Sequence, residues 1–144
     1  MTKELNFTKS SHEFTVIKTK DFSVVIRAWP SEQATMFHPT IYEDVWRWNV
    51  YANIFDSHPL FNNVEAAKNL PFHFGATYDQ FITTEPTEKK YDWQKSYKTL
   101  KVGSDYQHYA DNFEYDDPKD GVPSQIMWDA KELVEALQDK LEKY

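Results

Sequence analysis

The sequence predicts an α+β fold: an antiparallel sheet of about five strands with a C-terminal amphipathic helix packed on one face. In several short segments that precede residue 105, apolar and polar residues alternate with a period of two, which is typical of half-buried strands. Apolar residues repeat at spacings of three and four only near the C-terminus. Strands followed by one helix, without β-α-β alternation, favour an antiparallel sheet.

The first two strands are expected to form a hairpin over residues 13–29. Its alternating apolar residues are Phe14, Val16, Phe22, Val24 and Ile26. The polar pair Lys20-Asp21 between them suits a turn. Pro30 is expected to end the second strand because proline cannot continue a sheet ladder, and residues 31–40 are interpreted as a loop.

A third strand is predicted over residues 45–54, where alternation places Trp46 and Trp48 on one face. His58-Pro59 follows it and ends the extended segment.

The middle of the chain supplies the remaining strands. Residues 62–69 are consistent with a helical turn or a loop, and a fourth strand is predicted over residues 72–82. The charged segment 85–90 suits a turn, and a fifth strand is expected over residues 91–104.

The C-terminal helix is predicted over residues 130–143. Its apolar stripe consists of Ala130, Leu133, Val134, Leu137 and Leu141. Asp129 precedes Glu132 by three residues, the spacing of a capping box, so we expect Asp129 to be the N-cap. Trp128 and Leu133 are expected to pack together across this cap.

Length and composition exclude several classes of protein. A chain of 144 residues is expected to form a single domain, residues 1–144, with a flexible tail at residues 1–12. No apolar run is long enough to span a bilayer and the N-terminus has no hydrophobic signal region, so we expect a soluble, cytoplasmic protein without a membrane partner. With no cysteine, disulfides, thiolate metal sites and thiol nucleophiles are excluded. A net charge of −7 argues against direct binding to nucleic acid.

Aromatic residues make up 17% of the chain. They are expected either to line a pocket or an interface, or to fill an aromatic-rich β core. The sequence leaves both interpretations open.

Polar residues gather in three blocks, at residues 56–61, 72–78 and 103–111. Two of the three glycines of the chain lie in these blocks beside histidines, where each glycine is expected to meet a backbone requirement. Because the first block follows the third strand and the last block follows the fifth, the blocks are expected to converge at one edge of an antiparallel sheet.

These blocks resemble those of a group of small tailed-phage proteins that carry an HPL block, an HGG-x-T-Y block and a G-F-D-x-x-H-x-G-D block. The likeness covers about residues 48–143 and includes the C-terminal helix. The matching residues are His58, Pro59, Leu60, His73, Gly75, Thr77, Tyr78, Gly103, Asp105, His108 and Asp111. The departures are Phe74, Ser104 and Ala110. The resemblance implies phage origin and a shared site rather than a named reaction.

Three interpretations of this site remain open. It is either a ligand site, a divalent-metal site or a set of side chains that cap loops and strand ends. The metal set would be His58, His73, His108, Asp105 and Asp111. The ligand-binding candidates are His58, His73, Thr77, Asp105, His108, Asp111, Trp46, Trp48 and Arg47. Arg27, Arg47 and Lys101 lie on predicted strands where they are candidates to bind an anion.

The leading functional hypothesis is a phage counter-defence protein of the infected bacterial cytoplasm. It would bind and sequester a small nucleotide immune signal without catalysis or cofactor, and oligomerisation would close its pocket. The first alternative is an acidic protein that inhibits a host nuclease or restriction enzyme by occupying its basic groove. The second is a metal-assisted phosphoesterase. The chain contains no G-x-S-x-G, P-loop or H-E-x-x-H motif, so the corresponding enzyme classes have no support.

Overall fold

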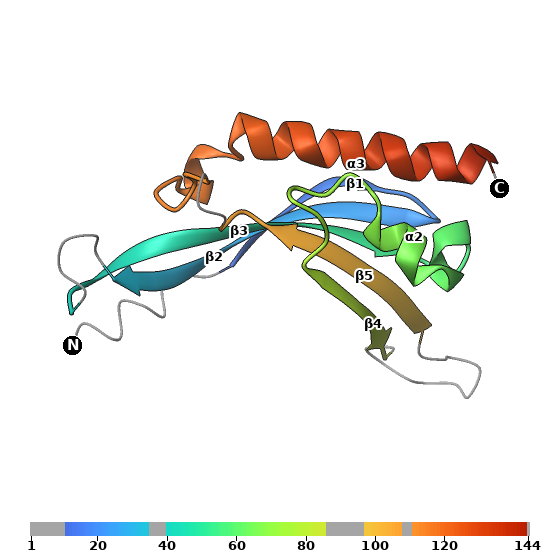
Figure 1. Cartoon of the computed structure of the whole chain (residues 1–144), viewed down its shortest axis with the longest axis horizontal. Coiled ribbons are helices and arrows are strands. Elements are labelled where there is room, and N and C mark those ends of the chain that lie inside the picture. Colours follow the sequence, from blue (N-terminus) through green and yellow to red (C-terminus); the bar gives the residue numbers. More distant parts are fainter. Residues whose placement is uncertain (1–10, 35–39, 86–96, 108–110, 144) are drawn as a thin grey trace.

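The chain forms a five-stranded sheet that carries a long C-terminal helix on one face (Figure 1). The computed structural model describes residues 11–34, 40–85, 97–107 and 111–143. All neighbouring strands are antiparallel, in the order β1-β2-β3-β5-β4. The predicted α+β fold, with the helix last in the chain, is therefore confirmed.

The N-terminal hairpin joins β1 (His12–Lys18) to β2 (Phe22–Ala34). Thr19 closes its turn, because the Thr19 hydroxyl oxygen accepts hydrogen bonds of 3.1 Å from the backbone N–H groups of both Asp21 and Phe22. A β-bulge between Thr15 and Ile17 shifts the register of β1. Since β1 begins at His12, the strand includes the last residue of the tail that was expected to be flexible.

The prediction that the second strand ends at Pro30 is wrong, because β2 continues to Ala34 and Pro30 lies opposite Trp46. Within the described residues the ladder between β1 and β2 ends at Ala28, and the partner of β2 at Pro30 is β3 (Tyr42–Ile54). Proline is tolerated on such a one-sided segment when its missing N–H faces away from the remaining partner. The expected loop over residues 31–40 is accordingly strand up to Ala34, and residues 35–39 lie outside the described residues.

A short connection follows β3, made of the 3₁₀ turn η1 (Pro59–Asn62) and the helix α2 (Val64–Lys68). The Asn63 side chain caps α2 by accepting a 3.1 Å hydrogen bond from the Ala66 backbone N–H. Of the two alternatives that the sequence left open for residues 62–69, a helical turn or a loop, the structure has the helical turn.

The fourth strand begins later than predicted, since β4 spans Tyr78–Thr84 and residues 72–77 form a turn and loop. Phe74 and Gly75 have φ angles of +54° and +86°, which no regular strand adopts. Strand β5 (Tyr97–Asp105) lies between β3 and β4, so β4 is an edge strand. Residues 91–96 of the predicted fifth strand lie outside the described residues.

The C-terminal helix α3 spans Ser124–Lys143, so the prediction that it begins after an Asp129 N-cap is wrong. The first turn forms directly after Pro123, whose carbonyl oxygen accepts a 3.0 Å hydrogen bond from the Met127 N–H. Asp129 therefore lies inside the helix. Trp128 was expected to pack against Leu133 across that cap. This is also wrong, because Trp128 is 64% exposed and its indole N–H donates to Glu132.

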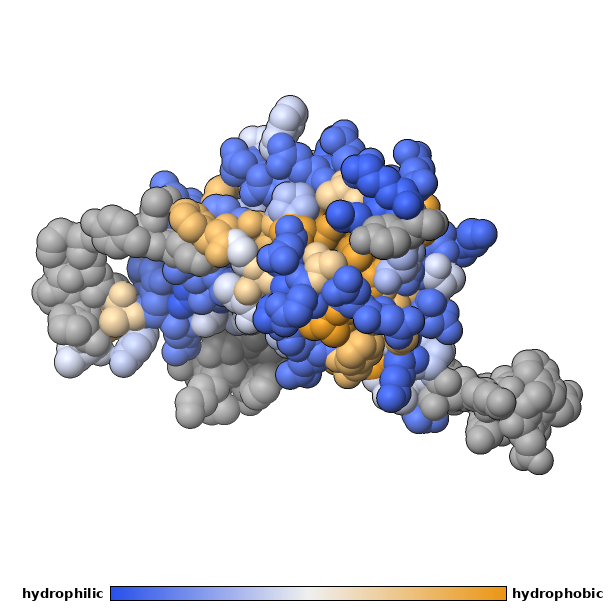
Figure 2. Space-filling model, turned by 45° about the vertical axis from the view of Figure 1, so that its right-hand side comes forward, coloured by the Kyte–Doolittle hydropathy of each residue, from blue (hydrophilic) through white to orange (hydrophobic). Residues whose placement is uncertain are grey.

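The core lies between α3 and the face of the sheet that α3 covers. The predicted helix stripe is confirmed at Ala130, Leu133 and Leu137, which are buried, and Ile126 extends it by one turn. Alternate residues of the central strands form the other side of the core: Phe22, Val24, Ile26, Ala28, Trp48, Val50, Ala52, Ile54, Leu100 and Val102. In Figure 2, hydrophilic residues cover the top of the molecule, where α3 lies in Figure 1, and hydrophobic residues are visible below them. No helix among the described residues is long and apolar enough to cross a bilayer.

Candidate functional site

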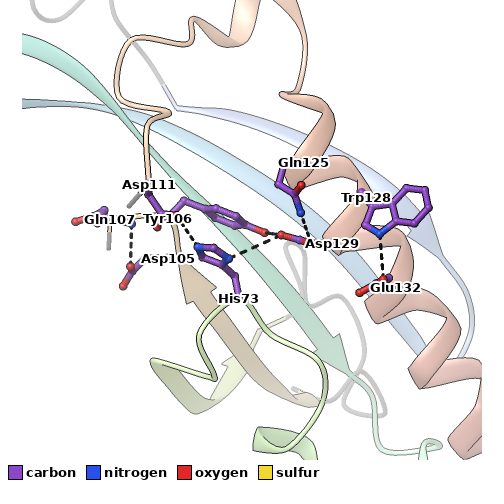
Figure 3. Close-up of polar contacts among 9 residues, drawn as sticks. All are labelled: His73, Asp105, Tyr106, Gln107, Asp111, Gln125, Trp128, Asp129 and Glu132. Carbon is purple, nitrogen blue, oxygen red and sulfur yellow. Dashed lines mark hydrogen bonds and ion pairs between the residues drawn. The ribbon is translucent and has the colours of Figure 1, made fainter. Parts of the chain in front are cut away.

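Two of the three polar blocks meet beneath α3, around His73 (Figure 3). His73 lies in the turn that precedes β4, and its Nε2 is 2.7 Å from Asp111 Oδ1, so the imidazole N–H donates to that carboxylate. On the other side, His73 Nδ1 is 4.0 Å from Oδ2 of Asp129 on α3. The His73 ring also stacks on Tyr106, with 4.2 Å between ring centroids and 9° between planes. Of the convergence expected for the three blocks, the structure therefore shows a contact between the second and the third, through His73 and Asp111.

The cluster is largely shielded from solvent, since the side chains of His73 and Asp111 are 18% and 6% exposed. The Tyr106 hydroxyl donates a 2.6 Å hydrogen bond to Asp129 Oδ2, and the Gln125 amide donates a 2.9 Å bond to Oδ1. Burial, followed by this hydrogen bond to the Asp129 carboxylate, raises the pKa of Tyr106 far above its ordinary value. The phenol therefore stays protonated and serves as a permanent donor.

We call His73, Tyr106, Asp111 and Asp129 the clasp, because they join the turn before β4, the segment after β5 and helix α3. Two carboxylates flank one imidazole, so an anionic ligand would meet repulsion here. The geometry suits a buried polar link between segments better than a phosphate site.

His58, from the first block, is buried and fully engaged within the fold. Its Nδ1 accepts a 3.0 Å hydrogen bond from the Leu60 N–H, which places the proton of the neutral ring on Nε2. Nε2 then donates to the Leu137 carbonyl oxygen at 3.1 Å. His58 thus caps η1 and ties it to α3, a capping role rather than a ligand contact.

The other predicted residues of the blocks lie apart from the clasp contacts described above. The Asp105 carboxylate accepts a 3.2 Å hydrogen bond from the Gln107 N–H at the end of β5. Thr77 is exposed just before β4, and its N–H donates to the Gly103 carbonyl oxygen at 2.8 Å. His108 lies outside the described residues. Within the parts of the chain that the structure describes, no group of three His, Asp or Glu residues is arranged to hold a metal ion.

The aromatic candidates on β3 serve the core. Trp48 is buried against Phe14, and its indole N–H donates a 3.2 Å hydrogen bond to the Asp116 carbonyl oxygen. Trp46 is half-buried and lies edge-on to His12. Arg47 is half-buried opposite Trp29 of β2, in the alternate set of β3 residues that points away from Trp46 and Trp48.

The face of the sheet opposite α3 bears no described helix (Figure 1). This face carries polar residues in register. We call it the open face. One row across four strands consists of Glu13, Arg27, Asn49 and Asp105. A second row consists of Thr15, Val25, Tyr51, Gly103 and Tyr78, and a third of Lys18, Ser23, Asn53, Lys101 and Gln80.

Gly103 makes the middle row possible. A Cβ at this position would lie 2.3 Å from Tyr51 Cδ1 and 2.9 Å from the Val50 carbonyl oxygen. The Tyr51 ring therefore lies directly over the glycine, edge-on to Tyr78 with 5.8 Å between centroids. The expected backbone requirement at Gly103 is close approach of an aromatic ring rather than an unusual φ angle.

The open face contains a hollow of about 370 Å³ next to this aromatic row. Its lining residues are Thr15, Lys18, Ser23, Val25, Asn53, Phe55, Ile82, Thr84, Tyr97, Thr99 and Lys101. The Lys101 ammonium lies 4.3 Å from the centroid of the Tyr51 ring, a cation–π contact. Burial, and then the nearby Arg27 charge, lowers the pKa of Lys101 from its ordinary value, while Glu13 opposes this shift.

Of these lining residues, only Lys101 is a candidate from the sequence, as one of the strand cations suited to an anion. Lys18 and the hydroxyl and amide groups are not individually recognisable from the sequence, because single polar residues at alternate strand positions look like ordinary solvent-facing residues. The hollow could have been recognised from the fact that several predicted strands carry Ser, Thr, Asn or Lys at the positions that alternate with their apolar residues. Comparison of the chain with protein-family models, with curated proteins and with solved structures gave no match.

Proposed function

We propose that this chain binds and sequesters a small nucleotide on the open face of its sheet, leaves it intact, and thereby acts as a phage counter-defence protein. The observation that carries the proposal is the hollow of about 370 Å³, which concentrates cationic and hydrogen-bonding groups in a chain of net charge −7. Phage origin rests on the sequence resemblance alone.

The charges of the hollow favour an anion. Lys18 and Lys101 both line it, and within the described residues neither ammonium has a carboxylate partner in an ion pair. A phosphate that accepts hydrogen bonds from both would replace water with charge-assisted contacts. Because the chain as a whole is acidic, it repels polyanions such as nucleic acid, and an anion is attracted only where the two lysines lie.

The remaining lining groups favour a nucleotide over inorganic phosphate. The hydroxyls of Thr15 and Thr99 are suited to sugar hydroxyls and ring nitrogens. The Asn53 amide donates a 3.1 Å hydrogen bond to the Ser23 hydroxyl, which leaves the Asn53 carbonyl oxygen as an acceptor and the Ser23 O–H as a donor. Tyr97 is 56% exposed and, with Phe55, offers aromatic surface to a base. The volume lies near the lower end of the range of small-molecule sites, about 300–1,000 Å³, which suits a small nucleotide.

Titration calorimetry with a panel of mononucleotides and small cyclic nucleotides tests the proposal. Lys101→Ala and Lys18→Ala should each weaken binding by about ten- to a hundredfold, the value of a charge-assisted hydrogen bond. The matched control is Lys98→Ala, because Lys98 lies on β5 but outside the hollow and is exposed. Equal affinity in wild type, Lys101→Ala and Lys18→Ala would contradict the proposal.

The same samples separate the alternative functions. Mass spectrometry of the nucleotide released after incubation with divalent ions should find it intact, and a cleaved product would favour a metal-assisted phosphoesterase. Binding to a host nuclease, with no binding to any nucleotide, would favour the acidic inhibitor.

A further inference from the structure

The two edges of the sheet differ in how they are protected against pairing with another chain. Strand β1 carries a bulge between Thr15 and Ile17 and the charged residues Glu13 and Lys18, features that disfavour edge-to-edge association. Strand β4 is seven residues long and has no proline, lysine or bulge. Among the described residues, β4 pairs only with β5, so its outer edge offers unpaired backbone groups.

Exposed apolar side chains accompany this free edge. On β4, Phe81 and Ile82 are 47% and 36% exposed, and Tyr97 on the neighbouring β5 is 56% exposed. Phe81 is positioned by an edge-on contact with Phe61, with 5.3 Å between ring centroids. Large exposed residues beside an unpaired strand edge are characteristic of an interface.

We propose that a second copy of this chain pairs with the outer edge of β4, antiparallel and about a two-fold axis at Phe81. The sequence of β4 is compatible with itself in this register, because Phe81 then faces its own copy and Asp79 faces Thr83. Asp79 is the only charged residue of β4, and its carboxylate lies 3.5 Å from Lys68 Nζ of its own chain. No like charges oppose each other across the axis, and the two sheets become one continuous sheet.

The pairing would also extend the proposed nucleotide site. Ile82 and Thr84 line the hollow, and in this register they face Gln80 and Tyr78 of the second copy on the same side of the joined sheet. This extension rests on the proposed function, whereas the dimer itself does not.

Size-exclusion chromatography coupled to light scattering, run on the 144-residue chain over a concentration series, tests the dimer. The wild type should have twice the chain mass of 17.1 kDa. Thr83→Asp places a carboxylate opposite Asp79 of the second copy, so its dimer dissociation constant should rise by about tenfold or more. Thr83→Lys places an ammonium there instead and should keep the dimer.

Comparing Thr83→Asp with Thr83→Lys also distinguishes a lost dimer contact from misfolding of the monomer. Within one chain, Thr83 lies opposite Lys98, so Thr83→Asp favours the folded monomer and Thr83→Lys disfavours it. The expected order of dimer affinities is therefore the reverse of the order of monomer stabilities. A monomeric wild type, or equal dimer affinity in the two variants, would overturn the proposal.

A charge exchange at the axis tests the register. Phe81→Lys and Phe81→Glu should each be monomeric, since like charges face each other, and an equimolar mixture should form a heterodimer. Glu13→Lys, on the opposite edge strand β1 and outside the hollow, should remain dimeric. A mixture that stays monomeric would refute the register, and none of these outcomes decides nucleotide binding, because Phe81 and Thr83 do not line the hollow.

Discussion

Replacing Gly103 by alanine tests how the open face is built. The added Cβ would lie 2.3 Å from the Tyr51 ring, whereas ordinary contact begins at 3.4 Å, so the ring has to move by about 1 Å. Overpacking of this kind costs about 1–3 kcal/mol, and the lower entropy of alanine in the unfolded chain offsets about 0.4–1 kcal/mol of that cost. The methyl group would also lie 2.9 Å from the Val50 carbonyl oxygen, which cannot move aside as a side chain can. We therefore expect a net cost in the upper part of this range, about 1–2.6 kcal/mol, and a fall in melting temperature of roughly 3–10 °C.

Thermal denaturation followed by circular dichroism measures this effect. Tyr51→Ala removes the ring that the new methyl group strikes but leaves the Val50 carbonyl oxygen 2.9 Å away, so Gly103→Ala should cost less in that background than in the wild type. Ser104→Ala is a control on the adjacent residue, since Ser104 is buried and its hydroxyl has no hydrogen-bond partner among the described residues. An unchanged melting temperature in Gly103→Ala, or an equal loss with and without Tyr51, would refute the reasoning.

Further predictions concern the helix and the clasp. Leu137→Ala should lower the free energy of unfolding by about 2–5 kcal/mol, because Leu137 is completely buried and its truncation leaves a cavity. Chemical denaturation measures this free energy. A loss below about half a kcal/mol would mean that the helix packs differently. Tyr106→Phe should cost about 1–3 kcal/mol, since Asp129 loses the donor that holds it in a shielded site. Because folding raises the pKa of Tyr106, the wild type should lose stability as the pH rises above the ordinary tyrosine pKa of about 10. Tyr106→Phe should reduce that alkaline loss, and an identical pH dependence of unfolding in the two proteins would contradict this role.

The places where the sequence misled share a physical cause. Proline at residue 30 and the capping-box spacing at Asp129 are local signals, and neither reports how β2 is paired or where α3 begins. Pro30 remains in a strand opposite Trp46, and within the described residues β2 pairs only with β3 at this position. Asp129 matches a cap in sequence but lies inside α3, where Tyr106 and Gln125 donate to its carboxylate.

For the candidate site, the sequence indicated which residues matter but not what they contact. Rare glycines beside histidines correctly indicated that the second and third blocks contain special positions, and His73 meets Asp111. Whether such residues bind a ligand or hold the fold together depends on which partners surround them. His58 has both ring nitrogens engaged with backbone groups of η1 and α3, a fact that requires the packing of residues 79 positions apart.

By itself, the sequence determined the α+β class, the alternating core residues of the strands and the buried stripe of the last helix, because hydrophobic periodicity reports directly which side of an element is buried. Only the tertiary structure decided that β5 lies between β3 and β4, which residues share a row on the open face, and which strand edge stays free. Those features depend on strand order and register, which arise from contacts between residues far apart in the chain and leave no local pattern.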